Sequence, residues 1–449
     1  MKAGTIGPPA GFQQPLGGPV HPRRLAFDLR RLPDPVLVMS LRLRSLFLLA
    51  ALLAVPAAAC AQEAPEVPLD LQVDVVYLAS DLLEGRATGT PGEALAARYI
   101  AARFEELGLT PGGTDGWYQP FDFRYSANPH APASEGEMRT GRNVVGVLDR
   151  GAPHTVVVGA HYDHLGHGGF GSRAPGVSAI HNGADDNASG VAALLEIARQ
   201  LTASEARANN YVFVAFSGEE LGLYGSKHFV EHALPALGAV NYMINLDMVG
   251  RLSADRALAI NGTGTSPAFA AALDAAGDGF RINRHESGLG PSDHASFYLA
   301  GMPALHLFTG QHADYHKPED DSPRINFEGI AAVASLAVDL IEALDDDGRL
   351  AFTKTKDEDQ GRRTAFKVSL GIMPDYVSAG EGVRIDAVLD GRPAAAAGLQ
   401  QGDVIVRLGA VEVSDINAYM EALAQFEEGA VTTIVVRRGD ERIEREIRF

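Results

Sequence analysis

Apolar residues follow two different spacings along the chain from residue 73 onwards. Over 73–109 they recur at three- and four-residue steps, which predicts helices, and Gly, Thr and Pro interrupt this pattern at 86–92. The same spacing predicts a helix with one apolar face over 189–201. Short apolar runs rich in β-branched residues alternate with the helical segments and predict strands that are buried on both faces. These runs cover 144–147, 155–158, 211–216 and 242–246.

This alternation of strands and helices predicts an α/β fold with a mixed, mostly parallel central sheet flanked by helices. We expect 144–147 and 155–158 to be neighbouring strands of that sheet. In open sheets of this type, ligands bind beyond the carboxyl ends of the strands. Polar residues at or just after those ends are therefore the candidates for a functional site.

The N-terminal 61 residues differ in composition from the rest of the chain. Residues 1–38 are rich in Pro, Gly and Arg and show no periodicity, so we interpret them as a non-native or disordered extension. From Met39, two arginines, an apolar run at 46–55 and small residues up to Ala61 predict a secretory signal peptide over 39–61. Cleavage before Cys60 would leave a lipid anchor, and cleavage after Ala61 would not. Both predict an exported protein that is periplasmic, outer-membrane-anchored or secreted.

Composition narrows the chemistry that the chain can perform. Its 449 residues allow two or three domains, and 46% hydrophobic and 21% charged residues are typical of a globular protein. A net charge of −19 argues against a nucleic-acid partner. Because Cys60 is the single cysteine, an internal disulfide and a multi-thiolate zinc site are excluded. A metal site in this chain must use His, Asp and Glu.

Six such residues follow apolar runs or open a helix. They are His161, Asp186, Glu219, Glu220, Asp247 and His316. Catalytic zinc takes three protein ligands of these types, and paired zinc ions need one carboxylate between them. The six residues suffice for two zinc ions that share one carboxylate, with one glutamate left over as a base. The H-E-x-x-H and G-x-S-x-G signatures of other hydrolases do not occur.

Five fragments in this region resemble the motif series of the bacterial di-zinc aminopeptidases, a family of co-catalytic zinc exopeptidases. The fragments are His161-x-Asp163, Asp186-NASG, Glu219-ELGLYGS, Asn245-LDMVGR and Tyr315-His316. The family also contains glutamate carboxypeptidases and transferrin-receptor ectodomains, and the resemblance extends over about 73–344. It implies a zinc exopeptidase-like fold and a peptidase domain at 64–344.

The resemblance also implies a role for each matching residue. His161 and Asp247 would bind the first zinc, Glu220 and His316 the second, and Asp186 would bridge them. Glu219 would be the general base that acts on a two-zinc-activated water.

Outside these six residues, the roles are less direct. Asp163 would accept the second ring N–H of His161 and fix its tautomer, and Tyr315 would either stabilise the oxyanion or pack. Asp185 is expected to be structural, while Asp293 and His294 either line the pocket or are structural. The other histidines singled out are not expected to bind metal. They are His154, His164, His167, His181, His285 and His312.

A charged segment at 345–364 predicts a solvated linker. The residues that follow, 365–449, resemble a PDZ domain of the bacterial protease-associated type, which is a small β-sandwich or barrel with helices. Its most specific fragment is Gly391-RPAAAAGLQQGDVI. The resemblance implies that backbone N–H groups of Ser369, Leu370, Gly371 and Ile372 bind a peptide carboxylate. The peptide would lie beside a helix that carries Ile416, Tyr419 and Leu423. The alternative is a docking unit without a peptide ligand.

Together these patterns predict an exported zinc-dependent exopeptidase with two Zn²⁺ per chain. The most direct interpretation is an aminopeptidase that hydrolyses N-terminal residues of peptides with a free N-terminus. The alternatives are a catalytically silent binding protein on the same scaffold and a carboxypeptidase or glutaminyl cyclase relative. A peptide C-terminus or a protein ligand is expected at the PDZ domain. Membrane contact is expected only through lipidation of Cys60.

Overall fold

The computed structural model describes most of the chain from residue 67 onwards. The described residues are 67–125, 136–169, 171–174, 176–232, 239–355, 368–374, 382–388, 391–414, 416–439 and 441–449. The predicted N-terminal extension, the predicted signal peptide with Cys60, and linker residues 356–364 lie outside them. Among the described helices, none combines the length and the apolar character needed to cross a bilayer.

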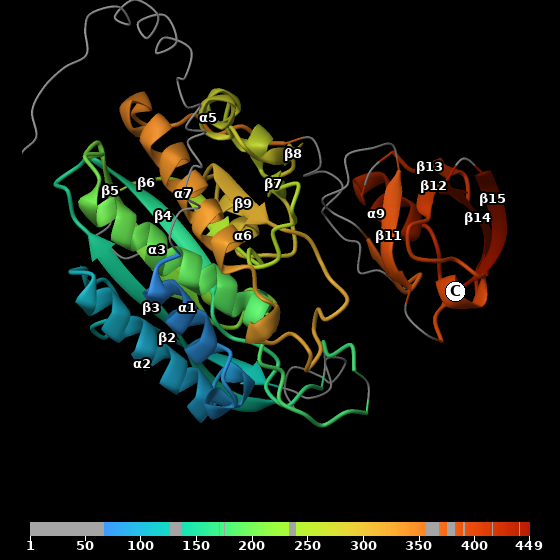
Figure 1. The fold of residues 1–449 in the computed structure, drawn as a ribbon, viewed down its shortest axis with the longest axis horizontal. Coiled ribbons are helices and arrows are strands. Elements are labelled where there is room, and N and C mark those ends of the chain that lie inside the picture. Colours follow the sequence, from blue (N-terminus) through green and yellow to red (C-terminus); the bar gives the residue numbers. More distant parts are fainter. Residues whose placement is uncertain are drawn as a thin grey trace, which may run out of the picture. The chain divides into compact units, whose positions relative to one another are not determined.

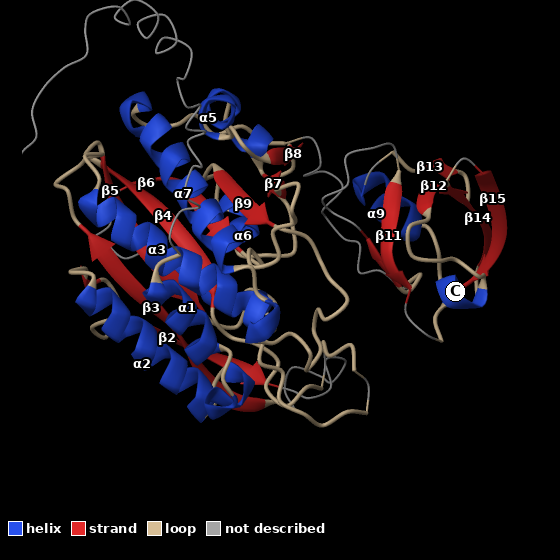
Figure 2. Cartoon of the chain, in the orientation of Figure 1, coloured by secondary structure: helices blue, strands red, loops and turns tan. Residues whose placement is uncertain are grey.

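Residues 67–355 form the first domain, in which helices flank a central sheet (Figures 1 and 2). Its helical elements are α1 (Leu69–Leu78), η1 (Asp81–Arg86), α2 (Pro91–Glu106), α3 (Gly190–Ala203), α4 (Tyr224–Glu231), α5 (Ala268–Ala276), α6 (His294–Leu299) and α7 (Phe327–Ala343). Its strands are β1 (Thr110–Pro111), β2 (Tyr118–Tyr125), β3 (Glu137–Leu148), β4 (His154–His161), β5 (Asn209–Phe216), β6 (Ala239–Leu246), β7 (Ala257–Asn261), β8 (Arg281–His285) and β9 (Ala304–Phe308).

The described strands of this domain form one nine-stranded sheet. The order is β1-β3-β5-β4-β6-β9-β7-β8, with β2 paired to β3. The centre, β5-β4-β6-β9, is parallel, whereas β3 is antiparallel to β5 and β7 is antiparallel to β9. The predicted α/β fold with a mixed sheet and a parallel centre is confirmed.

The prediction that 144–147 and 155–158 form neighbouring strands is wrong, because β5 lies between β3 and β4. The short connection between β3 and β4 passes the start of β5, where the Asn210 side chain forms hydrogen bonds with the backbone of that connection. Asn210 Oδ1 accepts N–H groups of Arg150 (2.8 Å) and Ala152 (3.1 Å), and its Nδ2 donates to the Ala152 carbonyl (2.8 Å). One side chain thus stabilises the crossing that the spacing of apolar residues does not reveal.

Helices cover both faces of the sheet, and the alternation of residues along β4 separates the two cores. Val156 and Val158 belong to the larger core, which includes side chains of α1, α2, α3, α5 and α7. Val157 belongs to a second core with Phe229 of α4 and Phe297 of α6. Strands that are buried on both faces are nearly all apolar, as predicted from their sequence.

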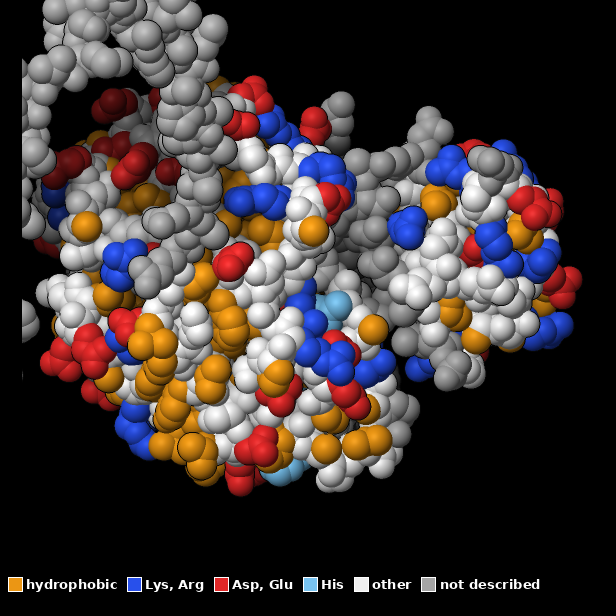
Figure 3. All heavy atoms as spheres, viewed as in Figure 1, with side chains coloured by type: hydrophobic (Ala, Val, Ile, Leu, Met, Phe, Trp, Pro, Cys, Tyr) orange, Lys and Arg blue, Asp and Glu red, His pale blue; other side chains and the backbone are white. Residues whose placement is uncertain are grey.

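Exposed hydrophobic side chains gather over α1 and η1 (Figure 3). Val73 and Val76 of α1 are about half exposed, and Leu69 of α1 and Leu82 of η1 are more than two-thirds exposed. The opposite side of α1 is tied to α2 through the buried Asp74, which accepts a hydrogen bond from Tyr99 Oη (2.7 Å). The apolar patch therefore belongs to a helix that is firmly packed on its other side.

The first part of the predicted linker contacts the first domain. Asp345 accepts hydrogen bonds from the N–H groups of Arg207 (2.9 Å) and Ala208 (3.1 Å). Leu350 is buried and its N–H donates to Asn241 Oδ1 (2.7 Å). The N–H of Thr355 donates to the Tyr298 hydroxyl (3.0 Å). The chain up to Thr355 thus adds to this domain despite its charge.

Residues 368–449 form the second domain, an antiparallel sheet with two short helices. Its elements are β10 (Ile372–Pro374), β11 (Val383–Val388), α8 (Pro393–Ala396), β12 (Val404–Leu408), β13 (Val411–Glu412), α9 (Ile416–Leu423), β14 (Val431–Arg438) and β15 (Glu441–Arg448). The order is β10-β11-β12-β14-β15, with β13 beside β12. Ile385, Ile405, Ile434 and Ile447 are fully buried in its core. Strand β10 lies at one edge of the described sheet.

Candidate metal centre

Four of the five predicted metal ligands, and the predicted base Glu219, lie at or follow the carboxyl ends of the four central parallel strands. His161 is the last residue of β4, and Asp247 directly follows β6. Glu219 and Glu220 follow β5, and His316 follows β9. Because β5, β4, β6 and β9 are neighbours in the sheet, these side chains meet at one edge.

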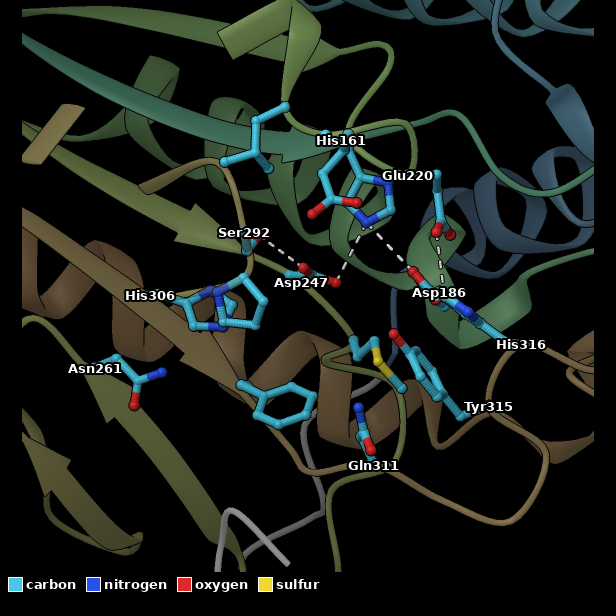
Figure 4. A pocket seen from close by; sticks show the side chains of 16 residues that line it. His161, Asp186, Glu220, Asp247, Asn261, Ser292, His306, Gln311, Tyr315 and His316 are labelled. Atoms are coloured by element: carbon cyan, nitrogen blue, oxygen red, sulfur yellow. Dashed lines mark hydrogen bonds and ion pairs between the residues drawn. The ribbon is translucent and has the colours of Figure 1, made fainter. Parts of the chain in front are cut away.

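Asp186 lies between the two histidines. Its Oδ1 is 3.3 Å from His161 Nε2, and its Oδ2 is 3.1 Å from His316 Nε2 (Figure 4). Asp186 comes from the irregular helical turn Ala184–Ser189, which leads into α3. Each oxygen of this one carboxylate thus faces a different imidazole.

A second carboxylate completes each half of the cluster. Asp247 Oδ1 is 3.4 Å from His161 Nε2, and Glu220 Oε2 is 3.2 Å from His316 Nε2. Each half therefore offers one imidazole nitrogen and two carboxylate oxygens, the donor set that catalytic zinc accepts, and the halves share Asp186. The residues present fit a pair of zinc ions.

The turn that carries Asp186 is hydrogen-bonded to the loop that carries Asp247. Asn187, which follows a cis peptide bond, donates its Nδ2–H to the Leu246 carbonyl (3.0 Å), and its Oδ1 accepts the Met248 N–H (3.1 Å). The Gly190 N–H also donates to Asn187 Oδ1 (2.9 Å), and a Cβ at Gly190 would lie 2.2 Å from that oxygen. Asn187 is thus needed for its hydrogen bonds to the loop of Asp247, and Gly190 is needed because a side chain there would clash with Asn187 Oδ1.

Asp185 and Asp320 stabilise the same turn through hydrogen bonds. Asp185 Oδ1 accepts the Gly250 N–H (2.6 Å), and Asp185 Oδ2 is 3.1 Å from His312 Nε2. Asp320 Oδ2 accepts the N–H groups of both Asp185 and Asp186 (3.0 Å each). Sequence reasoning did not identify Asp320, although it lies four residues after His316.

The far ring nitrogens of the two central histidines face main-chain carbonyls. His161 Nδ1 is 3.2 Å from the Asp163 carbonyl oxygen, whereas the Asp163 carboxylate is 3.8 Å away. This differs from the expected acceptor, because the Asp163 carboxylate instead accepts from Thr88 Oγ1 (2.9 Å) and the Glu219 N–H (3.2 Å). His316 Nδ1 faces the Gly171 carbonyl (2.8 Å). Both contacts favour tautomers that leave Nε2 available to a metal.

Ser292 orients Asp247. Its Oγ–H donates to Asp247 Oδ2 (2.7 Å) and its oxygen accepts from Asn245 Nδ2 (2.8 Å). Sequence reasoning singled out the two residues that follow, Asp293 and His294, which are buried and do not line the cavity described below. A hydroxyl in the same fragment was the available signal.

His164 also lies in the cluster, although it was not expected to. It is buried, and its Nδ1 is 2.7 Å from Glu220 Oε1 and 3.9 Å from Asp186 Oδ2. The available signal was its position three residues after His161, just beyond the end of β4. Two groups of side chains among the described residues could hold a metal: His161, Asp186 and Asp247, and His164, Asp186 and Glu220. His316 is in neither group, although its Nε2 lies 3.1 Å from Asp186 Oδ2 and 3.2 Å from Glu220 Oε2. The other expected non-ligands, His154, His167, His181, His285 and His312, are also in neither group.

Charges in the metal-free cluster are strongly coupled. Burial raises the pKa of Glu219 well above its ordinary value; His161 opposes this shift, and the Asp247 carboxylate adds to it. Burial acts in the same direction on Glu220, but the neighbouring His316 and His164 lower its pKa to about 2. The pKa values of the two adjacent glutamates are thus shifted in opposite directions by their surroundings.

A cavity of about 350 Å³ opens onto the cluster. Glu219 and Tyr315 line it together with His161, Asp186 and His316. In Figure 4 the Tyr315 side chain lies beside Asp186 and His316, and its ring stacks on His316 with centroids 3.9 Å apart. The other lining residues include the apolar Leu223, Met248 and Phe308 and the polar Asn261 and Gln311.

Two family models match consecutive parts of the chain. Residues 143–341 match the model of peptidase family M28, and residues 352–448 match the model of the PDZ domain. The chain contains an M28 peptidase domain followed by a PDZ domain. The first of these is a metallopeptidase domain, and the resemblance noted in the sequence is confirmed.

Curated relatives match the M28 domain. The aminopeptidase YwaD of Bacillus subtilis is 30% identical over 212 residues, which cover 44% of this chain and 43% of that protein. The probable lipoprotein aminopeptidase LpqL of Mycobacterium tuberculosis is 32% identical over 188 residues, which cover 38% of this chain and 34% of that protein. The chain therefore spans less than half the length of these two relatives.

Solved structures also resemble this chain. The zinc aminopeptidase BSAP from Bacillus subtilis is 20% identical with a TM-score of 0.48, covering 63% of this chain and 97% of its own. A glutaminyl cyclase from Porphyromonas gingivalis is 19% identical with a TM-score of 0.48, covering 61% of this chain and 96% of its own.

In the PDZ domain, Ser369, Leu370, Gly371 and Ile372 lead into the edge strand β10. Gly371 has a φ of 75°, and its N–H donates to Ser369 Oγ (3.2 Å). Tyr419 and Leu423 of α9 are buried in the domain core, whereas the side chain of Ile416 lies outside the described residues. An edge strand is the element beside which a bound peptide can extend a sheet.

Proposed function

We propose that this chain is an exported aminopeptidase that hydrolyses N-terminal residues of peptides with two zinc ions. The observation that carries the proposal is Asp186, whose two oxygens face the Nε2 atoms of His161 and His316. His161, Asp186 and Asp247 would hold the first zinc, and Asp186, Glu220 and His316 the second. When bound, the ions would lower the pKa of a water molecule and polarise the scissile carbonyl.

The chain's own residues then move the protons. Glu219 lines the cavity and is held by its backbone N–H, which donates to Asp163 Oδ1 (3.2 Å). It accepts the proton of the attacking water and passes it to the leaving amine as the C–N bond breaks. The Tyr315 hydroxyl donates a hydrogen bond to the oxyanion of the tetrahedral intermediate. Leu223, Met248 and Phe308 exclude water from the substrate side chain.

Aminopeptidase activity is preferred over the alternatives on the names of relatives. Aminopeptidase YwaD and the probable aminopeptidase LpqL support it, and a silent binding protein has no need of a complete set of zinc donors beside a spare glutamate. The word lipoprotein in the name of LpqL, together with residues 39–61, supports export. The PDZ domain would bind a peptide C-terminus or a protein ligand beside β10.

The test combines zinc measurement with turnover of aminoacyl-anilide substrates. We expect two zinc ions per chain, cleavage of free aminoacyl anilides, and no cleavage of N-acetylated ones. Glu219→Ala should keep both zinc ions and lose turnover by about 10²–10⁴-fold. Glu231→Ala, which alters an exposed glutamate of α4, should leave both unchanged. Wild-type turnover by Glu219→Ala at full zinc content would show that the proposed base is wrong.

A further inference from the structure

The two oxygens of Glu220 face two different histidines. Oε2 is 3.2 Å from His316 Nε2, on the side of Asp186, and Oε1 is 2.7 Å from His164 Nδ1. His164 is buried and lies just beyond the end of β4. The proposed ligand set assigns no role to His164.

The hydrogen bonds of the three histidines show how His164 differs from the other two. His161 and His316 each point Nδ1 at a main-chain carbonyl, of Asp163 (3.2 Å) and Gly171 (2.8 Å), so their Nε2 atoms can face a metal. His164 Nε2 is buried and has no hydrogen-bond partner among the described residues. If His164 used Nδ1 as a ligand, its N–H would be at this unpaired Nε2 atom, at a cost of about 1–3 kcal/mol.

With the proton on Nδ1, the same ring makes a short hydrogen bond and leaves only a lone pair unpaired. The Nδ1–H then donates to Glu220 Oε1 and turns Oε2 towards Asp186 and His316. Asp247 has the equivalent arrangement, because Ser292 Oγ–H donates to its Oδ2 (2.7 Å) while its Oδ1 faces His161. Each of the two unshared carboxylates thus has its own donor.

We infer that His164 is a positioning residue, which orients Glu220 for the second metal position and is not itself a ligand. The inference rests on the proposed two-zinc function. Hydrogen-bond partners of metal ligands contribute about 10–100-fold to metal affinity. His164 contacts Glu220 and Asp186 Oδ2, which is the oxygen that faces His316. Loss of His164 therefore lowers the affinity for the second zinc and leaves the affinity for the first unchanged.

The experiment measures zinc affinity in the full chain by competition with a chromophoric chelator, and zinc content after dialysis. His164→Leu, which removes the donor, is expected to bind the first zinc like wild type and the second about 10–100-fold more weakly. His164→Asn keeps an N–H donor near Nδ1 and is expected to restore most of the affinity. His167→Leu, at an exposed position of the same loop, is the matched control and should bind zinc like wild type.

Circular dichroism establishes that the variants are folded, and His164→Ala replaces His164→Leu if leucine unfolds the chain. The inference is overturned if the donor-less variant binds its second zinc as tightly as wild type, or if both zinc ions weaken equally. Asn failing to restore affinity also overturns it, because the donor would then not be the cause. A wild-type chain that binds fewer than two zinc ions overturns the two-zinc proposal as well.

Discussion

Arg86 donates its Nε–H to the carbonyl oxygen of Tyr162 over 2.8 Å, and Tyr162 directly follows His161. The same guanidinium donates to the carbonyls of Asn182 (2.6 Å) and Gly183 (3.1 Å), shortly before Asp186. Arg86 is fully buried, and it also donates to the Leu78 carbonyl. One side chain therefore joins the strand end that carries the first histidine to the turn that carries the shared carboxylate.

Replacing Arg86 should loosen both segments. Arg86→Met leaves several buried carbonyls unpaired, at about 1–3 kcal/mol each, so we expect it to lower the free energy of unfolding by about 3 kcal/mol or more and to lower zinc retention. Urea unfolding and zinc content measure the two effects. Arg281→Met, which removes a half-exposed partner of Asp255, should change stability by no more than about 0.5 kcal/mol. Equal stability of the two variants would contradict the role of Arg86.

The sequence predicted the sheet well because buried parallel strands carry a simple apolar signal. The runs at 211–216 and 242–246 lie within β5 and β6 as observed, and the helix predicted at 189–201 is α3. The order of β3, β5 and β4 was missed, since it depends on a crossing that Asn210 stabilises through backbone contacts. Apolar spacing records which face of a strand is buried, and it does not record which strand lies beside it.

For the site, the residues at strand ends could be brought together from the sequence, but the groups that orient them could not. His161 and His316 are 155 residues apart in number, and the rule about strand ends places both at one edge. Arg86 looked only like part of a break between helices, and Ser292 and His164 were overshadowed by neighbours with stronger chemical signals. Their roles depend on distances of about 3 Å that only tertiary structure provides.

Ser292 should matter through zinc rather than through substrate. Ser292→Ala removes the hydrogen bond to Asp247 Oδ2, so we expect the first zinc to bind about 10–100-fold more weakly. Chelator competition measures this, and Ser287→Ala, at another buried serine, is the control. Unchanged affinity in Ser292→Ala would mean that Asp247 is oriented by its other contacts alone.

Tyr315 offers a test of oxyanion stabilisation against packing. Its ring is held by His316 on one side and by the Arg173 guanidinium, 4.6 Å from the ring centroid. Tyr315→Phe keeps the ring and removes the hydroxyl, so we expect kcat to fall by about 10²–10³-fold with little change in KM or zinc content. Tyr224→Phe, at an exposed position, should retain wild-type kinetics. A kcat that stays within a few-fold of wild type would favour the packing role.

Zinc binding should release protons from the two central histidines. In the metal-free chain, burial lowers the pKa of both rings, but the Asp247 carboxylate beside His161 and the Glu220 carboxylate beside His316 outweigh it and raise both pKa values well above 6.5. The raised pKa values favour the protonated ring in the metal-free chain, whereas zinc requires the neutral imidazole. We expect about two protons to be released per chain at pH 7, and zinc affinity to fall as the pH falls below the raised pKa values.

Titration calorimetry in two buffers of different ionisation enthalpy measures the number of protons released by the metal-free chain. His316→Asn should release about one proton fewer than wild type, because Asn has no proton to lose at this position. His154→Asn, at the start of β4 and away from the cluster, should release as many protons as wild type. A release that is the same for His316→Asn and wild type would mean that His316 is already neutral in the metal-free chain, so that its carboxylate partners do not outweigh burial.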